Sequence, residues 1–433
     1  MQRRWYLRHG KVCGPVLSHA ASPAGPVATG SLIRSSLVAL AALMLTLFTF
    51  ALPSSAFACP TTLSPTGGDD TSAIQNAINS CVGVTLNSGT FNISCTGIAL
   101  GQGGRIFGAG SGATTITTTC TNKPMVTHSS TNTPGIKGVR LTRSVTAVSG
   151  GTGIDGTGNN SGQWYLNDVE VDHQYIGIKE DGAAYAPLFN LKVHDNVSDG
   201  INVVTPSGAD RAMTLYLDTV QSYNNGGWGL YWNGQHAGFT STGDWVKVST
   251  WGNTLGGAKI TGTTAQARVT LSSFSGDSGV AEFVLDTAAE NTYAQMFTDT
   301  IFNNSSAGRG LYITSSVVTD VSVVNSSTAY GANGNCASGI LHDGSGTLLI
   351  RGGQFNSNGT CGTAGNKFGI LGNGRSGSRM GMDGITAQSN QTYNVVANGG
   401  TVVMSLSNSH VTPNTMVSCG ATTCNYLSGS GNW

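Results

Sequence analysis

Side chains that can transfer protons gather in one stretch of a chain that otherwise carries few charges. Charged residues make up 10% of the 433 residues, against roughly 25% in an ordinary soluble domain. In the segments NDVEVDHQ and NLKVHDN, Glu170 and Asp172 stand two residues apart, and so do Lys192 and His194. Carboxylates, amines and imidazoles are the groups that act as general acids and bases. These four residues are therefore the candidate catalytic residues.

Both segments alternate apolar and polar residues, which is typical of β-strands with one buried face. The alternation turns the apolar residues inward and the four candidate residues outward. In aligned strands Glu170 would lie beside Lys192, and Asp172 beside His194, about 4.8 Å away. The Cα atoms of Glu170 and Asp172 would be about 6.6 Å apart. That is near the lower end of the roughly 6.5 to 9.5 Å between the carboxyl groups of an inverting glycosidase. A like charge nearby would raise the pKa of one carboxyl, as a general acid requires.

Two kinds of polysaccharide cleavage fit these residues. In a hydrolase, one of Glu170 and Asp172 protonates the leaving oxygen and the other activates water, while His194 tunes Asp172 and no cofactor is required. In a lyase, Lys192 or His194 removes the proton beside a uronate carboxylate. Ca²⁺ held by Asp172 and Asp195 would then offset the charge of that carboxylate. The two carboxylates on one strand favour the hydrolase. The same residues can instead form cross-strand ion pairs on a solvated face.

Aromatic residues follow the charged stretch in the segment YNNGGWGLYWNGQH. The flat faces of sugars stack on such rings, and Trp228 and Tyr231 are the candidate sugar-binding residues. Alternation turns Tyr231 outward. The same alternation turns Trp232 inward, so we expect it to pack in the core. His236 and His342 stand in loop-like segments and are predicted to be surface histidines.

The elements that carry these residues repeat along the chain. Short segments that end in Gly plus an aliphatic residue recur at intervals of roughly 22 to 31 residues, which is a typical repeat length of a solenoid protein. Asp168 and Asp218 recur at one position of the repeat, so we interpret them as turn residues rather than catalytic ones. A second recurring set predicts a ladder of turn asparagines: Asn196, Asn224, Asn304, Asn325, Asn358 and Asn390.

One short segment, GGDDTSAIQNAINSC at residues 67–81, has helical instead of strand periodicity. Its apolar stripe at positions i, i+3, i+4 and i+7 comprises Ile74, Ala77, Ile78 and Cys81. The side chain of Asp70 or Thr71 is expected to cap its first turn. A stack of β coils exposes its core and its strand edges at each end. We therefore predict a helix over residues 71–80 that covers the first coil.

GDDTSAIQNAINSC and the following VTLNSGTFNISCTGIALGQGGRIFGAGSGATTI resemble the N-terminal portion of the pectate lyase superfamily, over residues 63–118. That superfamily includes polygalacturonases, rhamnogalacturonases, alginate-active enzymes and phage tailspikes. The resemblance implies an all-β fold, a single-stranded right-handed parallel β-helix solenoid with a short N-terminal capping α-helix, and a polysaccharide partner. The Gly-His-Gly and Arg-Ile-Lys motifs of polygalacturonases and the Asp-Pro-His-Glu motif of the epimerases are absent. The only Asp-Asp pair, Asp69-Asp70, lies in the helix motif.

Residues 1–58 have the pattern of a signal peptide: an Arg-containing head, the apolar run 37–52 and the small-residue site Ala56-Phe57-Ala58. The predicted organisation is a signal peptide over 1–58 and one β-helix domain over 59–433. Lipidation of Cys59 is an alternative. No second apolar run is long enough to span a bilayer, so no transmembrane segment is expected after signal removal. The protein is predicted to be secreted, periplasmic or at the cell surface.

Cysteine usage fits export, because an even number of cysteines remains after the signal is removed. These are Cys59, Cys81, Cys95, Cys120, Cys336, Cys361, Cys419 and Cys424. The first four are expected to staple the N-terminal end, and Cys419–Cys424 would close a C-terminal loop. Cys336 and Cys361 stand about one repeat apart and are predicted to form a disulfide between neighbouring coils.

A net charge of zero gives no attraction toward nucleic acid. Two classes of function remain. The first is a secreted polysaccharide-active enzyme, with hydrolase favoured over lyase. The alternative is a non-catalytic adhesin or glycan-binding surface protein.

Overall fold

The structure is a computed structural model that describes most of the chain beyond residue 60. The described residues are 61–101, 103–128, 133–156, 163–181, 185–204, 214–234, 241–262, 265–287, 295–303, 308–314, 319–322, 331–359, 367–373, 378–398, 403–411, 417–419 and 427–428. The predicted signal peptide, Cys59 and His236 lie outside them. Within these ranges, no helix has both the length and the apolar character needed to cross a membrane.

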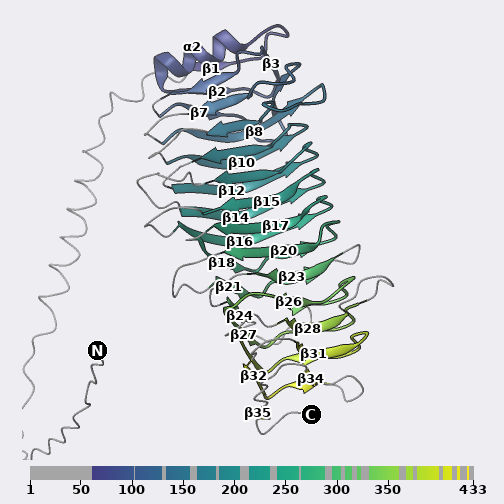
Figure 1. The fold of residues 1–433 in the computed structure, drawn as a ribbon. Coiled ribbons are helices and arrows are strands. Elements are labelled where there is room, and N and C mark those ends of the chain that lie inside the picture. Colours follow the sequence, from purple (N-terminus) through teal and green to yellow (C-terminus); the bar gives the residue numbers. More distant parts are fainter. Residues whose placement is uncertain are drawn as a thin grey trace, which may run out of the picture. The chain divides into compact units, whose positions relative to one another are not determined.

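The described strands stack into a right-handed parallel β-helix, as predicted (Figure 1). Each strand pairs in parallel with its counterpart one coil later. Among the described residues these pairings build one sheet of 20 strands, a second of 13 strands and a small sheet of two. The strand edges are therefore hydrogen-bonded from coil to coil, which leaves open edges only where the stack ends.

The 20-stranded sheet contains β1 (Thr61–Leu63), β2 (Gly83–Leu86), β3 (Gly89–Ile93), β5 (Arg105–Phe107), β6 (Thr114–Thr118), β8 (Gly135–Arg143), β10 (Tyr165–Asp172), β12 (Tyr185–His194), β14 (Thr214–Tyr223), β16 (Ser241–Trp251), β18 (Ala265–Thr270), β19 (Ser273–Ser275), β21 (Gln295–Thr298), β22 (Ile301–Asn303), β24 (Thr319–Ser322), β25 (Gly331–Ala332), β27 (Thr347–Arg351), β29 (Arg379–Asp383), β32 (Val403–Ser407) and β35 (Leu427–Ser428).

The 13-stranded sheet contains β4 (Ile98–Leu100), β7 (Val126–His128), β9 (Ile154–Gly156), β11 (Ile178–Asp181), β13 (Ile201–Val204), β15 (Trp228–Asn233), β17 (Gly256–Gly262), β20 (Ala281–Thr287), β23 (Arg309–Ile313), β26 (Ile340–His342), β28 (Phe368–Gly372), β31 (Tyr393–Ala397) and β34 (Val417–Cys419). The two-stranded sheet pairs β30 (Thr386–Ala387) with β33 (His410–Val411).

The inward side chains form one continuous apolar core along the stack. Leu166, Leu188 and Leu217 occupy the same position in three successive coils, and each is 0% exposed. Full burial of one such side chain contributes about 1.5 to 3 kcal/mol. A single coil cannot enclose these side chains alone, so the stability of each coil depends on its neighbours.

An extra residue interrupts the long strands of the 20-stranded sheet at the same place in each coil. Asp168, Asn190 and Thr219 have φ values of 53°, 51° and 58°, and the cross-strand pairing passes over them. Asp168 therefore interrupts the pairing within strand β10 and does not lie in a turn, and its carboxylate accepts from the Ser111 hydroxyl at 2.8 Å. The prediction for Asp218 is wrong by one residue. Asp218 pairs with Phe189 on β12, and the residue that interrupts the pairing is Thr219.

Thr219 is a β-branched residue in a left-handed conformation, which is strained because Cβ crowds the backbone there. We expect Thr219→Asn to stabilise the protein by about 0.5 to 1 kcal/mol, because Asn tolerates this conformation. The reverse change in the neighbouring coil, Asn190→Thr, should destabilise by a similar amount. Urea denaturation of both variants measures this, and a Thr219→Asn midpoint at or below that of the parent would contradict it.

A buried amide ladder follows these strands at the turn into the second sheet. The backbone N–H of Gln174 donates to Asn196 Oδ1 at 2.9 Å, and that of Asn196 donates to Asn225 Oδ1 at 3.2 Å. The ladder continues through Asn253. Asn196 is thus a ladder residue as predicted, and so are Asn358 and Asn390. Asn224 is not, because it is the exposed left-handed residue that precedes the ladder position. Asn304 and Asn325 lie outside the described residues.

The run of ladder residues from Asn196 to Asn253 leads to a buried pair of carboxyl groups. Asp277 Oδ1 accepts from the backbone N–H of Asn253 at 2.6 Å, and the backbone N–H of Asp277 donates to Glu282 Oε1 at 3.1 Å. Both side chains belong to residues that are 0% exposed. Burial, followed by the hydrogen bond and charge of Asp277, raises the pKa of Glu282 to about 11. Glu282 is therefore protonated at neutral pH.

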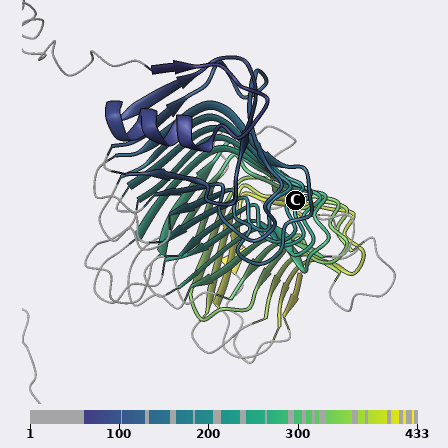
Figure 2. The ribbon, with the colours of Figure 1, turned by 90° about the horizontal axis from the view of Figure 1, so that it is seen from above.

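The predicted helix is α2 (Thr71–Cys81), which packs against β1, β2 and β4 (Figure 2). Its inward face includes Ile74 and Ile78, which are 0% and 3% exposed. The predicted capping is wrong, because the Asp70 side chain makes no capping bond. Asp70 accepts instead from Thr66 and from the backbone N–H of Asn92, so it ties the helix start to β3.

One disulfide joins Cys95 to Cys120, with the Cα atoms 5.1 Å apart. Cys81 and Cys336 are disulfide-bonded as well. Cys361, the predicted partner of Cys336, lies outside the described residues, as does Cys424.

Candidate functional site

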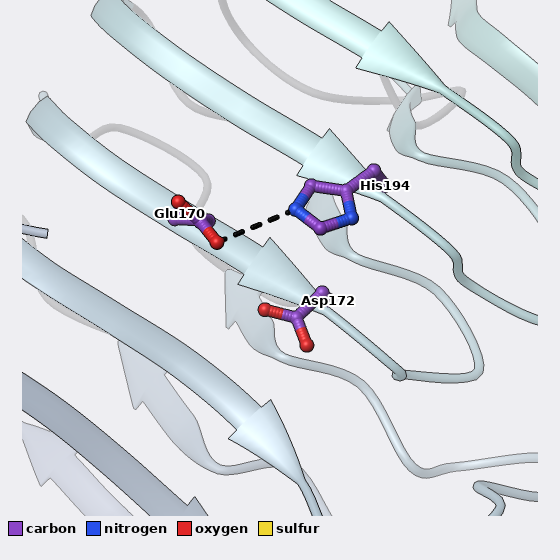
Figure 3. Close-up of side chains that lie close together, drawn as sticks. All are labelled: Glu170, Asp172 and His194. Carbon is purple, nitrogen blue, oxygen red and sulfur yellow. Dashed lines mark hydrogen bonds and ion pairs between the residues drawn. The ribbon is translucent and has the colours of Figure 1, made fainter. Parts of the chain in front are cut away.

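Strands β10 and β12 bring the four candidate catalytic residues together as the alternation predicted. Glu170 pairs with Lys192 and Asp172 pairs with His194 across the two strands. Figure 3 shows Glu170 and Asp172 on one strand and His194 on the next. The side chains of Glu170 and His194 are 17% and 10% exposed, whereas that of Asp172 is 0% exposed. Lys192 is exposed.

Arg140, on the preceding strand β8, explains the burial of Asp172. Its Nε lies 2.7 Å from Asp172 Oδ2 and its Nη2 3.2 Å from Asp172 Oδ1. The same Nε lies 3.2 Å from Glu170 Oε1. The Thr142 hydroxyl donates to Asp172, and His173 Nδ1 contacts the same carboxylate. One guanidinium thus bridges both carboxylates, and the groups around Asp172 close it off from solvent.

The surroundings of Asp172 fix its charge. Burial alone would raise its pKa, but the hydrogen bonds from Arg140, Thr142 and His173 together outweigh burial and hold the pKa below its ordinary value. In return, the hydrogen bond to Asp172 raises the pKa of Arg140. Asp172 is therefore an ionised group that positions Arg140. The expectation that a like charge raises the pKa of one carboxyl does not hold for Asp172.

His194 lies between two carboxylates. Its Nδ1 is 2.7 Å from Asp195 Oδ2, and its Nε2 is 3.4 Å from Glu170 Oε1. Asp195 stands in the left-handed turn that directly follows β12, with φ 52°. A carboxylate at Nδ1 fixes the ring orientation and leaves the reactive lone pair of the neutral ring at Nε2. Asp195, His194 and Glu170 therefore form a chain along which a proton can move.

Two aromatic rings extend this site along the stack. Tyr223 on β14 stacks on His194 with centroids 4.6 Å apart and planes 7° apart. Trp251 on β16 stacks on Tyr223 at 4.3 Å and 6°. The sequence interpretation missed Arg140, Tyr223 and Trp251 as site residues. Continuing the aligned positions by one coil before β10 and by two coils after β12 would have found them, because they stand in register with the candidate residues.

A shallow groove of about 460 Å³ borders the site at the turns after these strands. Its lining includes His173, Asp195, Asn224 and Gly252. The groove runs from coil to coil, so it is open to an extended ligand rather than to a compact one.

The predicted sugar-binding residues Trp228 and Tyr231 are half-buried on β15, which belongs to the 13-stranded sheet. The candidate catalytic residues belong to the other sheet, so the two sets do not share a face. Trp232 is 1% exposed in the core, as predicted. His342 is 0% exposed, so the prediction of a surface histidine is wrong. It points inward at the end of β26, and burial lowers its pKa to about 4.

A metal ion fits this site poorly. One ligand atom each from Glu170, Asp172 and His194 lie within 4.8 Å of one another, and Asp195 is not part of this group. Arg140 already bonds both carboxylates, so its positive charge opposes a cation at the same place. Asp172 and Asp195, the predicted calcium ligands, do not occur together in a cluster of three possible metal ligands among the described residues.

Glu170, His194 and Arg140 are arranged for proton transfer at His194. The two carboxyl groups are not arranged to lie on opposite sides of a glycosidic bond. The ligand oxygens of Glu170 and Asp172 lie within 4.8 Å of each other. That is well below the roughly 6.5 to 9.5 Å between the carboxyl groups of an inverting pair. Asp172 is also closed to a substrate. What faces solvent is Glu170, His194 and Arg140, whose side chain is 37% exposed.

No protein-family model and no curated protein matches the chain. Solved structures of similar fold include the Agl-KA catalytic domain, with TM-score 0.54 and 14% identity, covering 86% of this chain and 69% of that one. The A-module of a mannuronan C-5 epimerase from Azotobacter vinelandii has TM-score 0.48 and 14% identity, covering 88% and 98%. Tailspike protein 3 of bacteriophage CBA120 has TM-score 0.42 and 11% identity, covering 93% and 69%. The parallel strand pairing and the similarity to the Agl-KA catalytic domain show the parallel β-helix fold that the N-terminal motif implied.

Proposed function

We propose that this protein is a secreted enzyme that cleaves an extracellular polysaccharide containing uronic acids, by elimination. The observation that carries the proposal is the Asp195–His194–Glu170 chain beside the bridging guanidinium of Arg140. The sequence alone favoured hydrolysis. The short distance between the two carboxylates and the burial of Asp172 support elimination instead.

The uronate carboxylate would face Arg140. Nε and Nη2 of Arg140 are held by the protein, which leaves Nη1 to bind the substrate carboxylate. Neutralising that carboxylate makes the neighbouring C–H bond more acidic, because the developing negative charge spreads onto it. Arg140 thereby supplies the charge that the sequence interpretation assigned to Ca²⁺, so the proposed reaction requires no metal.

The proton transfer runs over the 3.4 Å contact between His194 and Glu170. Nε2 of His194 removes the proton from the carbon that bears the uronate carboxylate. The electron pair of that bond forms a carbon–carbon double bond as the glycosidic C–O bond breaks. Glu170, a carboxylate at rest, accepts this proton from His194 and passes it to the leaving oxygen. One proton leaves carbon and one reaches the departing sugar, so the reaction balances without a co-reactant.

The stacked rings of Tyr223 and Trp251 and the groove beside them would hold the sugars next to the reacting one. Aromatic rings stabilise carbohydrate by stacking, and a groove open along the coils suits a polymer. The aromatic stack alone would also serve a non-catalytic glycan-binding protein. Product analysis separates the two functions.

We expect the purified protein to release products with ultraviolet absorbance from a uronate polymer such as polygalacturonate, and none from dextran. The rate should be unchanged after treatment with EDTA, because Arg140 stands in for a metal. New reducing ends without absorbance would show hydrolysis and overturn elimination. Binding to polymers without any product would leave the glycan-binding alternative, and loss of activity with EDTA would contradict the metal-free mechanism.

A further inference from the structure

A second cavity lies on the outward side of the 20-stranded sheet, at the N-terminal ends of β8, β10 and β12. It encloses about 280 Å³. This is close to the lower end of the roughly 300 to 1,000 Å³ of ordinary ligand pockets, so it suits a short fragment and not a large cofactor. The candidate site lies near the C-terminal ends of the same strands.

Aromatic side chains give the cavity an apolar wall. Phe107, Tyr165 and Tyr185 line it, and Phe107 and Tyr185 are 40% and 38% exposed. The aromatic face continues beyond the cavity, because Phe189 lies 5.7 Å from Tyr165 and 5.4 Å from Tyr216, measured between ring centroids. A row of rings that stays partly open to solvent offers stacking surfaces for successive sugars.

The charged side chains of the cavity are all positive. Among the described residues that line it, Arg105 and Lys137 are exposed cations, and none is a carboxylate. In the part of the chain that the structure describes, neither cation forms an ion pair. Lys137 pairs with Phe107 across β8 and β5, so a cation and an exposed ring stand side by side. A ring next to an uncompensated cation matches a ligand that has both an apolar face and a negative charge.

We propose that this cavity is a second carbohydrate site that binds a carboxylated sugar. It would hold a distant uronate residue of the polymer that reacts at His194. The two sites share strand β10, where Tyr165 and Glu170 are five residues and thus about 16 Å apart. The identity of the polymer rests on the proposed function, whereas the charge and the rings of the cavity do not.

Affinity electrophoresis tests this inference through binding to the polymer instead of through product formation. Full-length protein is run in gels that contain polygalacturonate, dextran sulfate or dextran, as the wild type and as the double variant Phe107→Ala/Lys137→Ala. We expect retention of the wild type by polygalacturonate alone, and about tenfold weaker affinity for it in the variant. A second variant, Tyr185→Ala, removes the opposite wall. The matched control, Leu255→Ala/Lys123→Ala, removes an exposed apolar side chain and a cation elsewhere and should bind as the wild type does.

The outcomes separate this inference from the proposed function. If polygalacturonate is cleaved but both cavity variants bind it like the wild type, the second site does not exist. If nothing is cleaved yet the variants lose retention, the second site stands and the elimination reaction falls. Equal retention of the wild type by dextran, or preferred retention by dextran sulfate, would overturn the assignment to a carboxylated sugar.

Discussion

His194→Ala is expected to lower the rate of polysaccharide cleavage at least 100-fold, because a positioned general base contributes about 10² to 10⁴. His194 is the group that connects Asp195 to Glu170, at 2.7 and 3.4 Å. Its removal takes away both the base and the path by which the proton reaches Glu170. The initial rate of product formation at saturating polymer measures the effect.

Asp195→Asn distinguishes the role of Asp195 from that of His194. An amide can still accept the Nδ1–H bond and hold the ring, but it does not stabilise the charged imidazolium. We expect a smaller loss in kcat with little change in KM and a shifted pH profile. Lys123→Ala, an exposed change away from the site, serves as the control. Full turnover in a folded His194→Ala variant would show that the charged residues of β10 and β12 are a solvated face only.

Glu282→Gln is expected to raise the free energy of unfolding by about 3 to 5 kcal/mol at pH 8 and to leave it unchanged at pH 4. In the folded protein the pKa of Glu282 is about 11, raised from 4.5. Below pH 4.5 the carboxyl is protonated in both the folded and the unfolded state, so it does not lower the free energy of unfolding. Between pH 4.5 and 11 the unfolded chain ionises while the folded chain must keep its proton. The contribution of Glu282 to stability is therefore present at acid pH and lost as pH rises, at about 1.4 kcal/mol per pH unit.

Glutamine keeps the shape of the protonated acid and the acceptor for the backbone N–H of Asp277, but it does not ionise. Urea denaturation at several pH values measures the difference between variant and parent. Asp286→Asn is the control, because that carboxylate is 50% exposed and should show no comparable difference. A difference between Glu282→Gln and the parent that does not grow from pH 5 to pH 9 would contradict the buried proton.

The register of the candidate site could be predicted because two regularities act together. Alternation sets which side chains of a strand face outward, and the repeat sets which residues of two strands are neighbours. These rules placed Glu170 beside Lys192 and Asp172 beside His194, and they placed Trp232 in the core. The same rules were available for His342, which follows the inward Ile340 by two residues. The segment around His342 resembles a loop in sequence, and the surface prediction followed from that resemblance instead of from the alternation.

The burial of Asp172 could not be predicted in the same way. The burial of Asp172 depends on Arg140, which lies one coil before Glu170 and outside the acid-rich segment of the sequence. It depends also on the conformation of His173, whose φ of 58° turns its ring toward the preceding residue. Contacts that converge from several strands on one side chain leave no pattern within any single strand. The charge state of Asp172 therefore follows only from the assembled coils.

The disulfide between Cys95 and Cys120 also determines how the molecule responds to force. It links positions 25 residues apart in sequence, on two neighbouring coils near the helix-covered end. A solenoid pulled by its ends unwinds coil by coil, and each released coil of about 25 residues lengthens the chain by roughly 80 to 90 Å. The bridge keeps its own loop from extending while it is oxidised. Force spectroscopy would register that loop as a missing length of chain, which returns when a reductant is added.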